Sequence, residues 1–346
     1  MRDASSLRLQ YLRAPRGSWH LAGVTEAPAV LALTGRPLRL FLIGATGTIG
    51  RAIAQALLAR GHEVVCFVRP TAGKGLIDLA GAEIRFGDVT DLKSVERDGF
   101  KSERFDAVVS CLASRTGAPG DVWAIDYAAQ LNVLNVAKSL GVDRVILLSA
   151  ICLQKPKLAF QHAKIAFEEA LIGSGLSYTI VRPTAFFKSL SGQVKRVQRG
   201  KPWLLFGDGM LTACKPISDE DLAAFLVRCV EDSKLRNRVL PIGGPGPAIT
   251  PKEQADALFA LLGREPRYRH VPVRLMDIII AMLTMLGRVS RRLRDKAELA
   301  RIGRYYATES MLVLDQETGR YDAQMTPSTG TATLLDHYAR LVRDKG

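Results

Sequence analysis

The sequence lacks the features that mark several large classes of protein. Its 346 residues include five cysteines, with no CxxC pair and no cluster of cysteine with histidine. This spacing argues against a disulfide framework and a structural zinc site, and it favours a reducing compartment. The longest apolar stretch, residues 275–286, is interrupted by Asp277 and is shorter than the ~20 apolar residues of a membrane-spanning helix. We therefore expect a soluble protein with no metal site of its own.

Acidic residues are scarce relative to basic ones. The chain has 48 lysines and arginines against 34 aspartates and glutamates, a formal net charge of +14. Half of this surplus lies in residues 264–304, which hold eleven basic and four acidic residues. A basic surface attracts nucleic acid, acidic lipid or a carboxylate-bearing substrate. Because no nucleic-acid motif accompanies the charge, no nucleic-acid partner is expected.

The order of apolar runs predicts a doubly wound α/β fold. Runs of strand type alternate with segments of helical length, and they occupy residues 38–43, 63–69, 83–86, 107–111, 145–148 and 179–181. Such alternation is typical of βαβ units in a parallel sheet. We assign residues 38–185 to a Rossmann-type cofactor core and residues 186–346 to a smaller, mostly helical substrate region that interleaves with it. Residues 1–37 form an extension that is expected to be flexible, with an organelle-import peptide as the alternative.

Two helix starts can be read from the second half of the chain. Ser218 and Thr250 each precede an apolar stretch, and each is followed within three residues by acidic side chains. This is the pattern of a helix cap, and proline at the first position after Thr250 strengthens it.

A glycine-rich turn follows the first predicted strand. Its glycines have GxxGxxG spacing and lead into a helical stretch that runs to about residue 59. In this setting the glycines permit a tight turn, a close backbone approach to a pyrophosphate and close packing of helix on strand. The phosphates then lie on unpaired N–H groups at the start of the helix. The predicted cofactor contacts in this turn are Gly44, Thr46, Gly47, Thr48, Ile49 and Gly50.

The residue that ends the second strand distinguishes between the two nicotinamide dinucleotides. An acidic residue there favours NAD, whereas this chain has Arg69, whose planar cation suits a phosphate. The prediction is NADPH, and a solvated surface arginine is the alternative. After the third strand, Asp88 and Val89 are expected to meet the adenine, although Asp88 could instead cap the helix that begins near Thr90.

The region after the fifth strand resembles the short-chain dehydrogenase/reductase superfamily, in its extended or atypical branch. Members use a serine followed by Tyr-x-x-x-Lys, in which the lysine holds the nicotinamide ribose and lowers the pKa of the tyrosine. The resemblance implies Ser149 and Lys164 as catalytic residues, but Phe160 stands where the tyrosine belongs. Ser149 as a helix cap and Lys164 as a solvated side chain are the structural alternatives. His162 is a weaker candidate for the proton donor.

The missing tyrosine argues against ordinary carbonyl reduction. A carbon–carbon double bond conjugated to a large ring is an acceptor that presents no carbonyl oxygen to protonate. Hydride adds to its terminal carbon, the ring delocalises the negative charge, and protonation can follow from water or a weak acid. We therefore expect a reductase for a conjugated double bond.

Five segments carry a more specific resemblance. They are SAICLQKP at 149–156, VRPTAFFKSLSGQ at 181–193, FGDG and ACKPIS within 206–218, LPIGGPGP at 240–247, and GRYYATESM at 303–311. Together they resemble the NADPH-dependent 3,8-divinyl chlorophyllide 8-vinyl reductases of plants and photosynthetic bacteria, from about Leu38 to about Tyr338. The resemblance implies reduction of one vinyl group of a divinyl chlorophyll precursor to ethyl, within chlorophyll or bacteriochlorophyll synthesis. The magnesium belongs to the tetrapyrrole substrate.

The same resemblance implies further contacts after the sixth strand. Pro183, Ala185 and Phe186 would meet the nicotinamide. A planar macrocycle needs an apolar wall, and its propionate needs a cation. The predicted substrate contacts are Phe187, Lys188, Trp203 and Lys215, with burial in the core as the alternative for each aromatic. The resemblance implies a bacterial cytoplasm or a plastid, with a peripheral position at a photosynthetic membrane as an option.

Several interpretations stay open at this stage. Residues 275–286, with Arg288 and three further arginines behind them, are either a buried helix beside a basic turn or a helix that lies against an anionic membrane. The alternative functions are a non-catalytic NADP(H) sensor, a subunit of a membrane complex, and an enone or quinone reductase. The proton donor, the oligomeric state and the choice between chlorophyllide and protochlorophyllide are not predicted.

Overall fold

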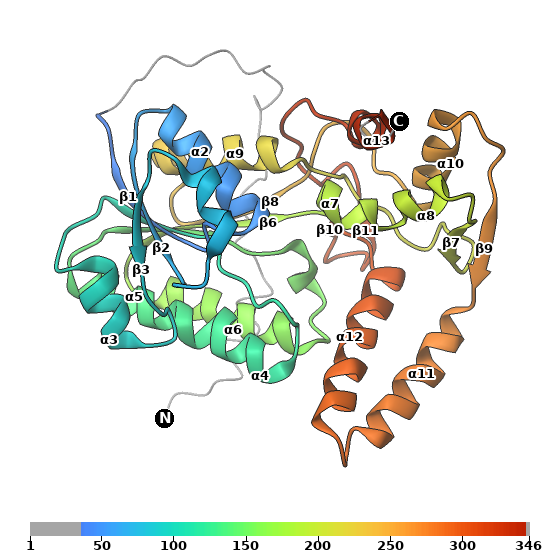
Figure 1. Ribbon diagram of the computed structural model, residues 1–346, viewed down its shortest axis with the longest axis horizontal. Coiled ribbons are helices and arrows are strands. Elements are labelled where there is room, and N and C mark those ends of the chain that lie inside the picture. Colours follow the sequence, from blue (N-terminus) through green and yellow to red (C-terminus); the bar gives the residue numbers. More distant parts are fainter. Residues whose placement is uncertain (1–35, 344–346) are drawn as a thin grey trace.

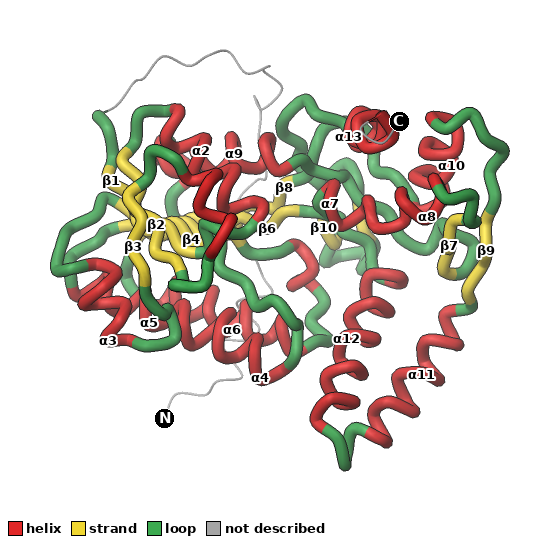
Figure 2. The backbone as a smooth tube through the Cα atoms, in the orientation of Figure 1, coloured by secondary structure: helices red, strands yellow, loops and turns green. Residues whose placement is uncertain are grey.

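A parallel sheet of seven strands, in the order β3-β2-β1-β4-β5-β6-β8, forms the centre of the protein (Figure 2). The computed structural model describes residues 36–343, so almost all of the extension predicted for residues 1–37 lies outside the described residues. The strands are β1 (Arg39–Ile43), β2 (Glu63–Val68), β3 (Glu83–Phe86), β4 (Ala107–Ser110), β5 (Arg144–Leu148), β6 (Ser177–Pro183) and β8 (Arg238–Ile242). The strand order reverses between β1 and β4, which is where doubly wound sheets bind their ligands.

Six of these strands confirm the predicted apolar runs, and the seventh strand was not predicted. β8 pairs in parallel with β6 at the edge of the sheet, where Val181 lies opposite Leu240. Its sequence, RVLPI, contains Pro241, which cannot donate a hydrogen bond to a neighbouring strand. An edge strand tolerates this loss on the side that has no neighbouring strand. Because Pro241 interrupts the apolar run, the sequence pattern did not predict β8.

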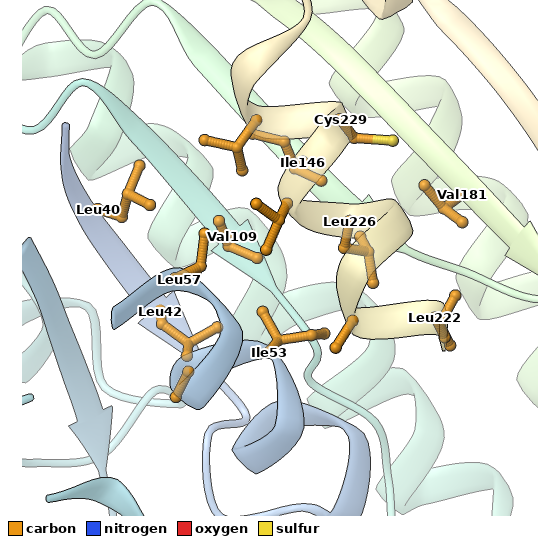
Figure 3. Close-up of a cluster of buried hydrophobic side chains, with 14 of the residues drawn as sticks. Leu40, Leu42, Ile53, Leu57, Val109, Ile146, Val181, Leu222, Leu226 and Cys229 are labelled. Atoms are coloured by element: carbon orange, nitrogen blue, oxygen red, sulfur yellow. The ribbon is translucent and has the colours of Figure 1, made fainter. Parts of the chain in front are cut away.

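Helices cover both faces of the sheet (Figure 1). One face carries α2 (Thr48–Ala59) and α9 (Asp219–Glu231); the other carries α3 (Leu92–Ser94), α4 (Pro119–Val122), α5 (Gln130–Ser139) and α6 (Ala159–Gly173). Alternate residues of a strand point to opposite faces. Leu40 and Leu42 therefore join the core beneath α2 and α9 (Figure 3), whereas Phe41 and Ile43 join the core on the side of α5 and α6. Both cores are apolar because both faces of the sheet are covered.

The C-terminal part adds a smaller region beside the sheet, as predicted. It contains α7 (Phe187–Leu190), α8 (Val194–Gln198), β7 (Trp203–Phe206), α10 (Pro251–Leu261), β9 (Tyr268–Val271) and α13 (Leu334–Arg343). β7 and β9 pair in parallel, and a separate core around Trp203, Leu258 and Tyr338 holds the region together. A short antiparallel pair, β10 (Val313–Leu314) and β11 (Tyr321–Asp322), leads from α12 towards α13. Between these elements the chain returns to the sheet for α9 and β8.

The helices α11 (Val273–Leu286) and α12 (Arg291–Thr308) form a hairpin that projects from the rest of the molecule (Figure 1). The interpretation of residues 275–286 as a buried helix is wrong, because α11 contains no buried side chain. One side of α11 contacts α12, through the ion pair of Asp277 with Arg304 and the hydrogen bond from Arg301 to Thr284. Among the described residues, no helix is long and apolar enough to cross a membrane.

Candidate active site

The glycine-rich turn connects β1 to α2 at the carboxyl end of the sheet. Gly44 has a φ of +78°, and a Cβ on it would lie 2.5 Å from the carbonyl carbon of Cys111. A Cβ on Gly50 would lie 2.2 Å from the carbonyl oxygen of Gly44. Glycine is therefore required at both positions by the close approach of α2 and the end of β4 to this turn. Gly47 is the N-cap of α2 and donates its N–H to the carbonyl oxygen of Gly44 at 3.1 Å.

The start of α2 suits an anion. Its first residues are neutral or basic, and the exposed N–H groups of a helix N-terminus attract phosphate. Lys188 comes from α7, and its ammonium donates a hydrogen bond to the hydroxyl of Thr48 at 2.7 Å. The Nη1 of Arg51 lies 3.3 Å from a carboxylate oxygen of Asp78. Lys188, which was predicted as a substrate contact, therefore lies beside the glycine-rich turn, and this part of the chain fits a dinucleotide.

The residues predicted at the adenosine end lie after β2 and β3. Arg69 is exposed directly after β2, so its guanidinium is accessible to a ligand. A carboxylate oxygen of Asp88 accepts hydrogen bonds from the backbone N–H and the hydroxyl of Thr90. Asp91, rather than Asp88, is the N-cap of the short helix α3. Asp88 therefore shapes the turn after β3, and Val89 beside it is buried.

Lys164 lies in α6 and forms an ion pair that the sequence did not predict. Its Nζ lies 2.9 Å from a carboxylate oxygen of Asp126, and the Lys164 side chain is mostly buried. Asp126 is only 1% exposed and also accepts the backbone N–H of Ser114 at 3.2 Å. It belongs to a π-helical turn, Trp123–Ala129, a conformation that is frequent at functional sites. The signal for Asp126 was a single acidic residue in an otherwise apolar helical stretch.

Ser149 lies at the end of β5 and belongs to a buried polar network. Its hydroxyl donates a hydrogen bond to Glu168 of α6, and Glu168 forms an ion pair with Arg182 of β6. The network thus joins two neighbouring strands to the helix that covers them. The alternative of Ser149 as a helix cap has no matching hydrogen bond, since the 3₁₀ turn Ile151–Gln154 begins after Ala150 without a side-chain cap.

The residues after β6 divide between the cleft and the core. Ala185 and Phe186 are partly exposed at the end of the sheet, and Pro183 is buried. Phe187 is buried in the core of the C-terminal region, and the centroid of its ring lies 5.4 Å from the centroid of the His337 ring. Trp203 is 3% exposed in the same core, although it also borders a cleft. The structure thus favours the core alternative for Phe187, whereas Trp203 lies both in this core and at the wall of a cleft.

Lys215 was predicted as a partner for a propionate, but its ammonium already has partners. It donates to the carbonyl oxygen of Thr326 at 2.9 Å and lies 3.1 Å from the hydroxyl of Ser328. Burial lowers the pKa of Lys215. These contacts fasten the segment after β11 to the end of the sheet, and they give Lys215 a structural role in the described part of the chain.

A cleft of about 220 Å³ lies beyond the carboxyl end of β6. Its walls come from α7, β7, α10 and the end of α12, and include Leu190, Trp203, Phe206, Gln254 and Tyr306. A larger hollow of about 740 Å³ lies at the opposite, amino ends of the strands, beside Leu38, Asp106 and Arg144. Because parallel sheets bind ligands at their carboxyl ends, we assign the smaller cleft to the active site. Residues 36–343 contain no cluster of three or more histidine, cysteine or acidic side chains that could hold a metal.

Comparisons with known proteins agree with this geometry. A family model described as NAD(P)H-binding matches residues 44–233. The divinyl chlorophyllide a 8-vinyl-reductase of Oryza sativa subsp. indica is 46% identical over 96% of this chain and 88% of its own length. The enzyme of that name from Arabidopsis thaliana is 45% identical over 99% of this chain and 87% of its own length. This chain belongs to the divinyl chlorophyllide a 8-vinyl-reductase family.

Solved structures show how widely the fold of these 8-vinyl-reductases is shared. A UDP-glucose 4-epimerase of Thermotoga maritima, solved with UDP-glucose, superposes with a TM-score of 0.65 at 18% identity and covers 89% of this chain and 99% of its own. The NADPH-dependent quinone oxidoreductase QOR2 of Escherichia coli, solved with NADPH, gives a TM-score of 0.64 at 19% identity over 88% of this chain and 99% of its own. At these identities the likeness concerns the fold alone.

Proposed function

We propose that this chain catalyses the NADPH-dependent reduction of the 8-vinyl group of a divinyl chlorophyllide to an ethyl group. The proposal is carried by identity of 45–47% with enzymes named for this reaction, over most of their length. Two features of the site support it. The glycine turn fits a dinucleotide, and Phe160 replaces the tyrosine that carbonyl reductases of this superfamily use.

The residues at the carboxyl ends of the strands have distinct roles in holding the cofactor. NADPH supplies a hydride when it is bound. The N–H groups at the start of α2, together with Lys188, bind the pyrophosphate, and Arg69 binds the phosphate of the adenosine ribose. Lys164 holds the nicotinamide ribose, and the buried carboxylate of Asp126 fixes the position of its ammonium. Burial of Asp126 in turn favours the pairing, because an unpaired buried charge is costly.

We propose a second property, contact of the α11–α12 hairpin with an anionic membrane, in a plastid or at a photosynthetic membrane of a bacterium. The exposed apolar side chains of α11 recur at helical spacing: Leu275, Ile278, Ile279, Met282, Met285 and Leu286. They form one stripe that faces away from α12. Arg288, Arg291 and Arg292 are exposed at the tip of the hairpin. An apolar stripe beside clustered arginines matches the chemistry of an anionic lipid surface.

The deciding experiment is incubation of the purified protein with NADPH and 3,8-divinyl chlorophyllide a, followed by chromatography and by the position of the Soret band. We expect loss of one vinyl group, faster with NADPH than with NADH. A parallel reaction with divinyl protochlorophyllide measures the preference between the two pigments. Binding of NADPH without conversion of either pigment would contradict the proposal and favour a non-catalytic dinucleotide-binding protein.

A further inference from the structure

The place of the superfamily tyrosine is covered by the end of α12. Phe160 lies one helical turn before Lys164 in α6 and packs into a cluster with Ile302 and Tyr305 of α12. A phenylalanine at this position has no proton to give. His162, the weaker candidate on the same helix, is exposed to solvent, so we consider a donor on another element at this end of the sheet, where α12 is packed (Figure 1).

Two adjacent tyrosines at the end of α12 have different environments. Tyr305 is 3% exposed, and its hydroxyl donates to the carbonyl oxygens of Cys152 and Lys155 at 2.9 and 3.1 Å. Tyr306 is 45% exposed and borders the cleft of about 220 Å³. Its hydroxyl oxygen lies 3.9 Å from the Sγ of Cys152. The hydroxyl of Tyr305 is thus occupied by hydrogen bonds to the backbone, whereas the side chain of Tyr306 borders the cleft.

The hydroxyl of Tyr306 faces Cys152, in the segment that follows β5. Cys152 follows Ser149 by three residues at the end of β5, and the positive charge of Lys164 acts on its thiol. Cys152 and Phe160, which stands at the place of the missing tyrosine, belong to the same apolar cluster, so the Tyr306 hydroxyl lies beside that cluster. The ring of Tyr306 is partly exposed, but burial of its hydroxyl end beside the Cys152 thiol raises the pKa of Tyr306 well above its ordinary range. The phenol therefore carries its proton near neutral pH.

We propose that Tyr306 is the catalytic proton donor of this reductase, in place of the tyrosine that α6 lacks. The inference rests on the proposed function. The terminal vinyl carbon gains the hydride that oxidises NADPH to NADP⁺, and the electron pair of the double bond moves to the inner carbon and the conjugated ring. The O–H bond of Tyr306 then breaks, its proton bonds to the inner carbon, and the phenolate regains a proton from water.

The test compares Tyr306→Phe with Tyr305→Phe, a matched control that also removes one hydroxyl. General acid catalysis contributes about 10²–10⁴-fold to a rate, so we expect Tyr306→Phe to lower kcat by at least about 10²-fold. Its affinity for NADPH, measured by fluorescence titration, should not change. Tyr305→Phe should lower the thermal midpoint, through loss of two hydrogen bonds, and keep most of kcat.

A second readout separates proton donation from a structural role. In Tyr306→Phe, kcat should rise with the concentration of imidazolium buffer at constant pH, because a small acid replaces the lost donor. The wild-type rate should not depend on the buffer. A Tyr306→Phe protein that is folded and turns over like the wild type would overturn the proposal, as would a slow variant that no buffer acid rescues.

Two further outcomes keep the inference distinct from the proposed function. If the wild-type protein reduces neither pigment, the proposed function fails, whatever Tyr306 does. If Tyr306→Phe does not fold, incorporation of 3,5-difluorotyrosine at position 306 provides a nearly isosteric and more acidic phenol. We then expect the alkaline limb of the kcat–pH profile to move to lower pH, and an unmoved limb would overturn the assignment.

Discussion

At the scale of single residues, we expect the cofactor preference to depend on Arg69, an exposed cation at the end of β2. Arg69 has no acidic neighbour in the sequence, and its position after the strand is the one that discriminates NADPH from NADH. A hydrogen bond to a charged group contributes about 1.5–3 kcal/mol. The preference therefore depends on a small number of contacts, and it can be reversed by one substitution.

We expect Arg69→Glu to weaken NADPH binding by about 10- to 150-fold, the range that corresponds to loss of one charged hydrogen bond. NADH binding should change little, because NADH carries no phosphate at that position. Fluorescence titration with both dinucleotides measures the two affinities. Arg51→Ala is the control, since Arg51 pairs with Asp78 and should have a smaller effect. Equal losses for NADPH and NADH would contradict the role of Arg69.

Ser149 allows a second prediction at this scale, because its hydroxyl is already bound within a buried network. Ser149→Ala leaves Glu168 with Arg182 as a partner, so we expect a loss of about 1–3 kcal/mol of unfolding free energy and little change in kcat. Glu168→Gln leaves the Arg182 charge without its carboxylate, and should cost about 3–5 kcal/mol. Denaturant unfolding and steady-state assays measure both effects. A fall in kcat of about 10²-fold for Ser149→Ala would instead support a catalytic serine.

At the scale of elements, the sequence predicted what depends on local pattern and missed what depends on long-range contacts. The helix that begins after Thr250 has the predicted cap, in which the Thr250 hydroxyl and the Glu253 carboxylate bond reciprocally to the backbone. Ser218 likewise accepts the N–H of Asp221 at the start of α9. β8 was missed because Pro241 interrupts its apolar run, and the ion pair of Lys164 with Asp126 was missed because it joins two separate helical segments.

The packing of α13 predicts a pH dependence of stability. The Nε2 of His337 lies 3.0 Å from the hydroxyl oxygen of Ser191. Burial lowers the pKa of His337, and the positive charge of Arg340 lowers it further, whereas the negative charge of Glu220 raises it. The unfolded chain therefore binds a proton at a higher pH than the folded chain does. The contribution of His337 does not reduce the free energy of unfolding above about pH 6.5, the ordinary pKa of histidine. Below that pH the free energy of unfolding decreases, because the unfolded chain binds the proton more readily.

Substitution of His337 by glutamine should remove this part of the pH dependence. We expect the difference in unfolding free energy between pH 7.5 and pH 5.5 to be smaller in His337→Gln than in the wild type. Urea unfolding at the two pH values measures it, with His270→Gln as the control, because that histidine lies exposed on β9. A difference of the same size in His337→Gln and wild type would show that other groups carry the effect.

At the scale of the whole molecule, fold class and family were readable from the sequence, but the arrangement of the hairpin was not. The apolar stretch 275–286 was ambiguous, because periodicity alone does not distinguish a helix in a core from a helix on a surface. The ion pair of Asp277 with Arg304 settles which side of α11 contacts the protein. The remaining apolar side is open, and its neighbourhood carries much of the net charge of +14.

We expect the wild-type protein to sediment with vesicles that contain anionic phosphatidylglycerol and not with pure phosphatidylcholine vesicles. Each arginine near such a surface contributes about 1 kcal/mol, and added salt should weaken the binding. The double substitution Ile278→Asp and Met282→Asp should abolish sedimentation. Leu92→Glu, at an exposed apolar residue of α3 on the far side of the molecule, is the control. Unchanged sedimentation of the double variant would exclude α11 as the binding surface.

The order of elements along the chain also has a consequence for biosynthesis. The sheet is complete once β8 ends at Ile242, and every strand end that meets the dinucleotide precedes it. The cleft, by contrast, needs the end of α12, and the segment around Ser328 must return to pair beside Gly243. On the ribosome, the emerging chain therefore completes the sheet and its glycine-rich turn before the cleft exists. A nascent or truncated chain that ends before α12 would have the whole sheet and lack the cleft.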